Sequence, residues 1–478
     1  MNKSITKNYI YNLIYQVLLL ILPVILTPYV SRVLGAENIG IYSYTLSISA
    51  YFILFGSVGI ALYGQREIAF NQDDRKKYSV IFWEILFLRI ATMTISLLVF
   101  YFSFVKGDQY QIFYRILMLE IIANFIDISW FLQGLEEFKK TVIRNVLVKL
   151  ISIVAIFLFV KTKNDLIIYF IIHVLSLLLG NASLWLYLPK FIDKIKFKDL
   201  HIARHIKPTI GLFIPQIAIK VYTLLDTTMI GAIIENKSEV GYYDQGQKVI
   251  KLLLAVITSL GTVMMPRIAN TFASGNKEQV KKYMEKSFNV VFIMAFPMIF
   301  GIISVAKTFV PVFFGKGYDK VVILMCLISP IILLIGLSNV TGTQYLLPTK
   351  RQKEFTFSVV CGAIVNTILN ICLIWKFGAI GASIGTVVAE LTVTSMQMFF
   401  VRRDFDIFEI IRLSKKYVIA SIIMFVSCSI VKIFIKGNLV STIIQVFVGV
   451  IIYGIVLLIL KDKFIFEIIN KIKAKIKI

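Results

Sequence analysis

The sequence IIQVFVGVIIYGIVLLIL occupies positions Ile443–Leu460 and contains no charged residue. A mostly apolar run of about 18 or more residues is long enough to cross a bilayer as an α-helix. Comparable runs recur along the chain, among them LIYQVLLLILPVIL at Leu13–Leu26 and the longer stretch Ile81–Phe104. The chain is therefore predicted to be an all-α, polytopic membrane protein.

The composition of the whole chain agrees with this prediction. Of the 478 residues 58% are hydrophobic and 16% are charged, and the mean hydropathy is +0.83. A soluble chain is about 45–50% apolar and about 25% charged, so a soluble enzyme, a nucleic-acid-binding protein and a secreted disulfide scaffold are excluded. The net charge of +24 does not indicate nucleic acid here, because the basic residues lie in short loops between the apolar runs.

The apolar runs predict about fourteen transmembrane helices. Their approximate ranges are 10–33, 40–63, 79–104, 112–134, 142–161, 165–188, 208–234, 240–268, 286–312, 321–347, 354–376, 378–401, 416–436 and 439–460. Lys and Arg concentrate in alternate loops, for example at Arg75–Lys77 and Lys350–Arg351, which places both termini in the cytoplasm. The outer loops are too short to hold a catalytic site and the inner loops lack a nucleotide-binding motif, so we do not expect an enzyme.

A weak internal repeat relates two halves of the chain at one constant offset. The matched pairs are Gly40 with Gly241, Tyr42 with Tyr243, and Arg66 with Arg267. An even number of spans separates the copies, so the repeat would be parallel, with a pseudo-two-fold axis along the membrane normal. Chance is the alternative for a match over so few positions. Two related six-helix lobes are typical of a transporter that rocks around a central cavity.

The repeat and the loops suggest four segments. Residues 1–188 form the N-terminal six-helix lobe, and residues 189–207 form a basic cytoplasmic linker. Residues 208–401 form the C-terminal six-helix lobe, and residues 402–478 hold an amphipathic linker, two extra helices and a basic cytoplasmic tail. Three cytoplasmic stretches look amphipathic, namely Lys190–His205, Arg402–Lys416 and Lys461–Ile478. Each is interpreted as an interfacial helix on anionic lipid headgroups, with docking of a partner as the alternative.

Many charged residues lie inside the predicted spans, where each would cost about 2.5–3.5 kcal/mol on a lipid-facing helix. Some share a depth with an opposite charge and are candidates for structural ion pairs. These pairs are Arg89 with Glu120, Asp127 with Lys149, and Asp226 with Lys248. Lys220 and Lys251 have no evident partner near mid-membrane, and would make a cavity that attracts anions; the alternative is that they pair with groups that the sequence does not reveal. The candidate substrate-binding residues are Arg32, Arg89, Lys220, Lys248 and Lys251.

A second group of residues suggests a cation. Asn366 and Asn370 are four positions apart and share one face of a predicted helix, Glu390 lies in the next span, and Asp226 lies in the seventh. Carboxylate and amide oxygens are ligands that hard cations such as sodium prefer. A proton relay through Glu390 and plain interhelical hydrogen bonding are the alternatives.

The segment Pro28–Ala69 resembles the N-terminal signature of polysaccharide flippases of the Wzx type. The resemblance is carried by SRVLG at Ser31–Gly35, by Gly40, by YSY at Tyr42–Tyr44, and by Tyr63-Gly64 followed by REIA at Arg66–Ala69. Wzx-type proteins transport O-antigen and capsular repeat units. They belong to the MATE-like superfamily of multidrug, oligosaccharidyl-lipid and polysaccharide exporters, and are similar to lipid II flippases.

The resemblance implies a function and a location. The chain would move an undecaprenyl-diphosphate-linked oligosaccharide from the inner to the outer leaflet of the bacterial cell membrane, by alternating access driven by a cation gradient. Its partners would be this lipid-linked sugar, membrane lipids and possible polysaccharide polymerases and glycosyltransferases, and no nucleic acid.

The resemblance also implies a site for the coupling ion. In lipid II flippases a sodium site uses acidic, amide and hydroxyl groups that correspond to Asp226, Asn366, Asn370 and Thr386. Asn370 stands where those flippases have an Asp, and Glu390, one turn beyond Thr386, would compensate. No cofactor is expected apart from Na⁺ or H⁺ as the coupling ion. The alternative function is a MATE-type efflux antiporter of small organic cations, but its cavity should be acidic, and Lys220 and Lys251 argue against that.

Overall fold

The structure is a computed structural model that describes residues 5–107, 109–195, 198, 200–435, 439–462 and 464–466. All regular elements among these residues are helices. The chain divides into two compact units. Unit 1 comprises Met1–Gly231 with Asn236–Gly241, and unit 2 comprises Ala232–Glu235 with Tyr242–Ile478.

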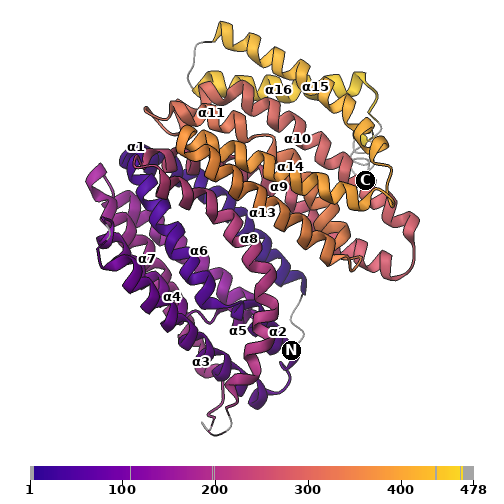
Figure 1. The fold of residues 1–478 in the computed structure, drawn as a ribbon. Coiled ribbons are helices and arrows are strands. Elements are labelled where there is room, and N and C mark those ends of the chain that lie inside the picture. The colour runs from indigo at the N-terminus through magenta and orange to yellow at the C-terminus, as the bar shows by residue number, and fades with distance from the viewer. Residues whose placement is uncertain are drawn as a thin grey trace. The chain divides into compact units, whose positions relative to one another are not determined.

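Unit 1 is built from eight α-helices and several short 3₁₀ and π segments (Figure 1). Its α-helices are α1 (Ile5–Ser57), α2 (Ile60–Phe70), α3 (Arg75–Phe100), α4 (Gln111–Phe125), α5 (Ser129–Gly134), α6 (Phe138–Phe159), α7 (Leu166–Leu184) and α8 (Ile206–Ile233). Its short segments are η1 (Tyr101–Val105), η2 (Lys163–Asp165), η3 (Trp185–Lys190) and η5 (Ile202–His205). Helix α1 is kinked at Gly35, whose φ of 77° suits glycine because it has no Cβ.

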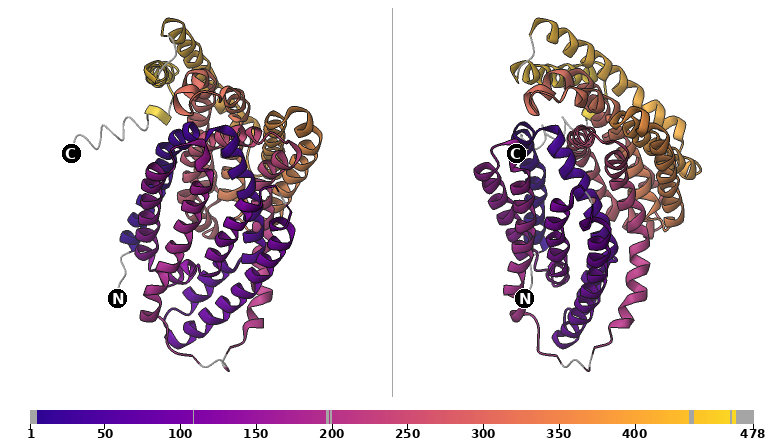
Figure 2. Two further views of the ribbon diagram at one scale, coloured as in Figure 1. Left: turned by 90° about the vertical axis from the view of Figure 1, so that its left-hand side faces the viewer. Right: turned by 60° about the vertical axis from the view of Figure 1, so that its left-hand side comes forward.

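The helices of unit 1 run alongside one another over most of their length (Figure 2). Helix α4 packs against α7, α6 against α7, and α1 against α3, α4 and α6. A core of buried aromatic and aliphatic residues lies where α2, α3 and α5 meet. Phe82 and Trp130 stack there with ring centroids 5.6 Å apart.

Unit 2 contains most of α9 and all of the helices that follow it. They are α9 (Ser238–Ala273), α10 (Lys277–Phe313), α11 (Asp319–Ile328), α12 (Ile331–Ser338), the π-helix η6 (Asn339–Leu346), α13 (Gln352–Phe377), α14 (Ala379–Val401), α15 (Ile407–Phe434) and α16 (Leu439–Ile459). Helices α13 and α14 form an antiparallel hairpin, whereas α15 and α16 pack against each other and on α10.

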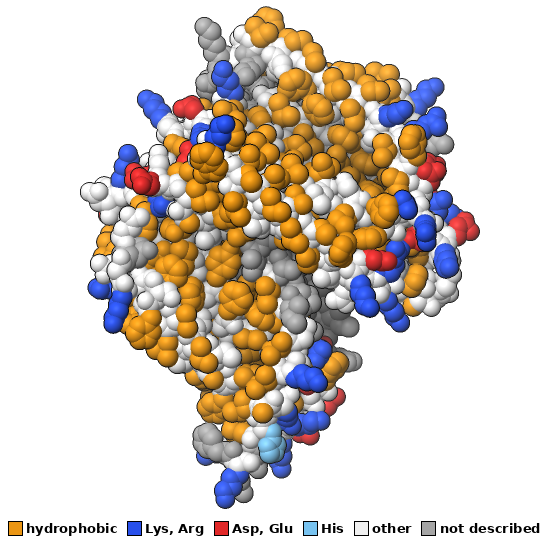
Figure 3. All heavy atoms as spheres, in the orientation of Figure 1, with side chains coloured by type: hydrophobic (Ala, Val, Ile, Leu, Met, Phe, Trp, Pro, Cys, Tyr) orange, Lys and Arg blue, Asp and Glu red, His pale blue; other side chains and the backbone are white. Residues whose placement is uncertain are grey.

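The prediction of an all-α membrane protein is confirmed. Twelve helices in the described part of the chain are long and apolar enough to span a membrane. One of them, Ile21–Phe70, has 50 residues and contains the second half of the first predicted span and the whole of the second, and the predicted seventh span coincides with α8. The count of fourteen stays a prediction. Hydrophobic side chains are spread over much of the described surface that faces the viewer in Figure 3.

Two of the sequence-based expectations about the cytoplasmic stretches need correction. Arg402–Lys416 is not a separate interfacial helix, because α15 begins at Ile407 and continues without a break into the predicted span. Lys190–His205 is not one helix either, since η3 ends at Lys190 and η5 begins only at Ile202. The third stretch, Lys461–Ile478, lies largely outside the described residues.

Helix α8 groups with unit 1, although the sequence suggested that a C-terminal lobe begins at residue 208. Two contacts bind it there. Thr228 shares a hydrogen bond with Ser47 of α1 at 2.9 Å, and His205, directly before α8, contacts Glu84 of α3.

The predicted repeat is visible at one crossing inside unit 1. A Cβ on Gly40 would lie 1.7 Å from the carbonyl oxygen of Lys237, and one on Gly241 would lie 2.0 Å from that of Ala36. Ala36 and Lys237 are related by the same offset as Gly40 and Gly241. The contact is therefore reciprocal, as a two-fold relation between the copies requires.

Candidate functional site

Arg89 is buried inside unit 1, where a carboxylate and a carbonyl hold it. The residue is 2% exposed, its Nη2 lies 3.5 Å from Asp127 Oδ2, and its Nε donates to the Asn124 carbonyl at 2.7 Å. The predicted pairs of Arg89 with Glu120 and of Asp127 with Lys149 are therefore wrong. Helix α4 ends at Phe125, so Asp127 lies in the break before α5. The position of Asp127 along the predicted span therefore could not show which way its side chain points.

Glu120 has other partners in the same unit. Its Oε2 accepts a hydrogen bond from Ser49 Oγ at 2.9 Å, and its Oε1 lies 3.7 Å from His173 Nε2. Lys149 is exposed on α6. Arg89 and Glu120 thus take partners from other parts of unit 1, as burial requires, although Arg89 Nη1 has no hydrogen-bond partner among the described residues.

The other candidate cations lie at or near helix surfaces. Lys248 pairs with Asp244, one turn earlier on α9, at 2.7 Å. Arg32 on α1, Lys220 on α8 and Lys251 on α9 have exposed side chains. Lys220 and Lys251 have no carboxylate within ion-pair distance among the described residues.

In unit 2 the structure brings together three of the residues predicted to bind a cation. Asn366 and Asn370 are fully buried on α13, and Asn370 Nδ2 donates to Asn366 Oδ1 at 3.1 Å. They face α14 at Gly385, where a Cβ would lie 2.5 Å from Asn370 Oδ1. Thr386 is the next residue along α14. Glycine at position 385 therefore allows this close approach of the two helices.

Tyr243 joins this group and was missed as a site residue. Its hydroxyl lies 3.0 Å from Thr386 Oγ1, and it accepts a hydrogen bond from Gln247 Nε2 at 2.9 Å. The only sequence signal for Tyr243 was its place in the repeat. We call Asn366, Asn370, Thr386 and Tyr243 the amide cluster.

The two carboxylates predicted for cation coupling are both buried. Glu390 is 9% exposed on α14, one turn beyond Thr386, and Asp226 is 6% exposed on α8 of unit 1. Among the residues searched, no group of three or more His, Cys, Asp or Glu side chains is placed to hold a metal ion. Any cation bound at the amide cluster would be coordinated mainly by neutral oxygens.

A second polar group, which we call the carboxylate network, lies where η5 meets α2 and α3 in unit 1. Glu84 is fully buried, and its Oε2 lies 2.8 Å from His205 Nε2 and 2.5 Å from Arg204 Nη2. The His201 amide donates to Glu84 Oε1 at 2.5 Å, and Tyr63 Oη lies 2.7 Å from His205 Nδ1. The sequence placed Glu84 in a span and His201 and His205 one turn apart, but gave no sign that they meet.

Comparisons with known proteins agree with this architecture. The profile of a family described as "Polysaccharide biosynthesis protein" matches residues 5–272, which is more than half of the chain. A second profile, described as MatE, matches residues 212–372. An Escherichia coli K12 protein named as an O-antigen transporter is 28% identical over 409 residues, which cover 84% of this chain and 97% of the relative.

Two solved structures show the same fold. One is titled lipid II flippase MurJ in an inward closed conformation, with a TM-score of 0.77 and 16% identity over 96% of this chain and all of that chain. The other is an inward-facing multidrug resistance MATE family transporter, with a TM-score of 0.64 and 13% identity over 83% of this chain and 95% of that one.

Proposed function

The chain belongs to the family of polysaccharide biosynthesis proteins, and on this premise we propose that it is a flippase for lipid-linked oligosaccharides. It moves an undecaprenyl-diphosphate-linked repeat unit from the cytoplasmic to the outer leaflet for surface polysaccharide synthesis. The observation that carries this proposal is the similarity to an O-antigen transporter over 84% of this chain and 97% of the relative. The proposal places the protein in the bacterial cell membrane with both termini in the cytoplasm.

Lys220 and Lys251 are the residues that we propose for the diphosphate. Both belong to predicted spans, and both side chains are exposed. Because a charge on a lipid-facing helix is costly, each of these lysines is expected to face water rather than lipid. A fixed cation on either helix would replace part of the hydration of the diphosphate, and Arg32 would add to the positive field.

We propose the amide cluster as the site of the coupling cation. Its amide and hydroxyl oxygens suit a hard monovalent cation, and Glu390, one turn beyond Thr386 on the same helix, would supply negative charge. Asp226, in unit 1, is proposed separately as a carboxylate that takes part in cation coupling. The ion, sodium or a proton, is cargo in this cycle rather than a resident cofactor. Polymerases and glycosyltransferases of the same polysaccharide are the proposed protein partners.

The first experiment is deletion of the gene, followed by analysis of lipid-linked intermediates and of surface polysaccharide. A flippase predicts that the lipid-linked repeat unit accumulates on the cytoplasmic leaflet and that surface polymer is lost. Unchanged polymer together with greater sensitivity to cationic drugs would instead support an exporter of organic cations, the second candidate, which the MatE match and the MATE-like fold favour.

Complementation of the deletion strain tests the lysines. Lys220→Ala and Lys251→Ala should each abolish polymer export at normal protein levels, and arginine at either position should retain part of it. Lys277→Ala is the matched control, since Lys277 is also exposed but lies at the start of α10. Full export in both alanine variants would exclude these lysines as diphosphate ligands.

A further inference from the structure

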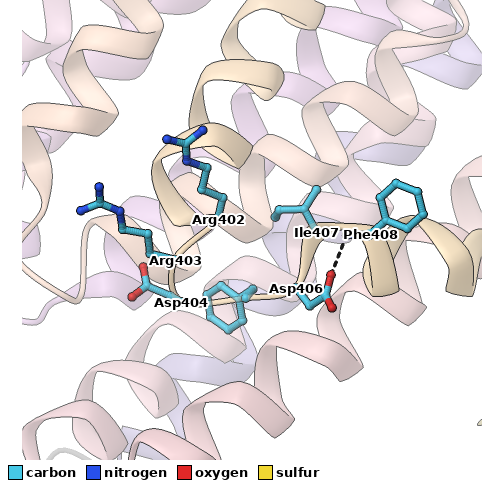
Figure 4. A pocket seen from close by; sticks show the side chains of 7 residues that line it. Arg402, Arg403, Asp404, Asp406, Ile407 and Phe408 are labelled. Atoms are coloured by element: carbon cyan, nitrogen blue, oxygen red, sulfur yellow. Dashed lines mark hydrogen bonds between the residues drawn. The ribbon is translucent and has the colours of Figure 1, made fainter.

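The connection between α14 and α15 forms a shallow hollow of about 450 Å³, lined by residues 402–408 (Figure 4). Both helices are membrane spans, so the connection lies at the membrane surface. In Figure 4 the side chains of Arg402 and Arg403 extend from the end of α14, whereas Phe408 lies at the start of α15.

The two carboxylates of the hollow are already bound within unit 2. Asp404 Oδ2 accepts a hydrogen bond from Arg351 Nη1 at 2.6 Å. Asp406 caps α15, because its Oδ1 accepts hydrogen bonds from the amides of Phe408 at 2.9 Å and Glu409 at 3.1 Å. No ion pair joins either carboxylate to Arg402 or Arg403 in the described part of the chain.

Arg402 and Arg403 are exposed, and neither has a carboxylate within ion-pair distance in the described part of the chain. The guanidinium of Arg402 lies 3.8 Å above the centre of the Phe399 ring, which fixes its position. The exposed carboxylates nearby in sequence are Asp404, Asp406 and Glu409. Since no ion pair joins them to Arg402 or Arg403, the two guanidiniums can bind an external anion.

An apolar surface adjoins these cations. Phe408 is 86% exposed and Ile411 is 58% exposed. The exposed face of α15 continues from them toward the other end of the span through Ile419, Ile422, Val426 and Ile430. The 28 residues of α15 have a length of about 42 Å, which matches a bilayer of about 40–45 Å including its headgroup layers. Phe408 then lies at headgroup level, above a face that contacts acyl chains.

We propose that Arg402, Arg403 and Phe408 form a binding site for an anionic phospholipid. The arginines hold the phosphate of the headgroup by charge-assisted hydrogen bonds, and Phe408 packs against the upper part of the acyl chains. The site lies outside the transport machinery described above. A protein partner is the less favoured occupant, because the exposed apolar face is continuous with the span.

Fluorescence quenching by brominated lipids tests this site. Phe408→Trp places a reporter at the apolar end, and the unsubstituted chain with its four tryptophans supplies the baseline. In vesicles of mixed composition, we expect brominated phosphatidylglycerol to quench the added tryptophan several times more efficiently than brominated phosphatidylcholine at equal mole fraction. Near an anionic surface each arginine contributes a preference of about fivefold.

Variants in the same background assign the preference to the arginines. Arg402→Ala with Arg403→Ala should bring the ratio of the two quenching efficiencies close to one, whereas Lys at both positions should retain part of it. The control is Lys277→Ala with Lys281→Ala, which removes two exposed cations from α10 of the same unit and should leave the ratio unchanged.

Three results would overturn the proposal. Equal quenching by both lipids would show contact with the membrane without selection of charge. Absence of quenching would place Phe408 outside the lipid and favour a protein partner. An equal loss of preference in the α10 control would show that the net charge of the unit, and not this site, attracts the lipid.

Discussion

The carboxylate network of unit 1 and the amide cluster of unit 2 are both buried, but they differ in charge. Glu84 carries a full charge, and Arg204, His205 and a backbone amide hold it. The amide cluster consists of two hydrogen-bonded pairs of neutral groups, Asn366 with Asn370 and Thr386 with Tyr243. A buried charge that loses its partner costs several kcal/mol, whereas a neutral group costs less.

This difference suggests a division of roles. The carboxylate network connects η5, at the start of α8, to α2 and α3, so its contribution is expected mainly in stability. The amide cluster can exchange its internal hydrogen bonds for a cation at small cost, so its contribution is expected mainly in transport. Three substitutions test this division, and the largest effect on stability comes first.

Arg204→Ala should lower the free energy of unfolding by about 3 kcal/mol, measured by denaturant titration in detergent. The substitution removes the positively charged partner of the fully buried Glu84. The expected loss of unfolding free energy lies at the low end of the range for broken buried ion pairs, because Arg204 is half exposed.

Arg75→Ala is the matched control for this substitution. Arg75 is also half exposed and binds Asp193 at 2.8 Å, but that carboxylate is exposed too. A loss of about 0–1 kcal/mol is expected for such a surface pair. Equal losses in the two variants would contradict a structural role for the buried carboxylate.

Gly385→Ala should lower the free energy of unfolding by about 1–3 kcal/mol and strongly reduce transport. The added methyl group would displace the Asn370 amide, 2.5 Å away. Export of polymer in the deletion strain gives the transport readout. Gly301→Ala is the control, because the nearest side-chain atom to its Cβ lies 4.0 Å away. Normal transport by the Gly385 variant would remove the amide cluster from the proposed mechanism.

Thr386→Val should have the smallest effect on stability, about 1 kcal/mol. It removes the hydrogen bond to Tyr243 as well as one to the Ala382 carbonyl of the same helix. Thr392→Val removes only the equivalent bond within α14, so the difference between the two variants reports the contacts that Thr386 makes beyond its own helix, including that with Tyr243. If the cluster binds the coupling ion, the dependence of transport on that ion should change in Thr386→Val and not in Thr392→Val.

Parts of the amide cluster were predictable because they depend on local spacing. Asn366 and Asn370 are four residues apart on a helix, which puts both amides on one face whatever the surroundings. Tyr243 was not predicted to join them, since nothing in the sequence states that α9 contacts α14 at this depth. The pairing of Arg89 with Asp127 failed for a similar reason. Two residues at the same depth in the membrane do not necessarily face each other. The sequence shows neither the direction in which a side chain points nor the break in the helix after Phe125.

The sequence by itself determined that this is an all-helical membrane protein, and it placed most of the long helices within a few residues, although α10 and α15 begin about nine residues earlier than predicted. This is possible because a helix that crosses the bilayer needs a minimum apolar length, and the apolar residues that supply it are consecutive in the sequence. Only the tertiary structure decided that Glu84 meets His205, that Gly385 admits Asn370, and that α8 groups with unit 1. These contacts join residues far apart in the chain, and they depend on how the helices rotate and pack, which no local pattern specifies.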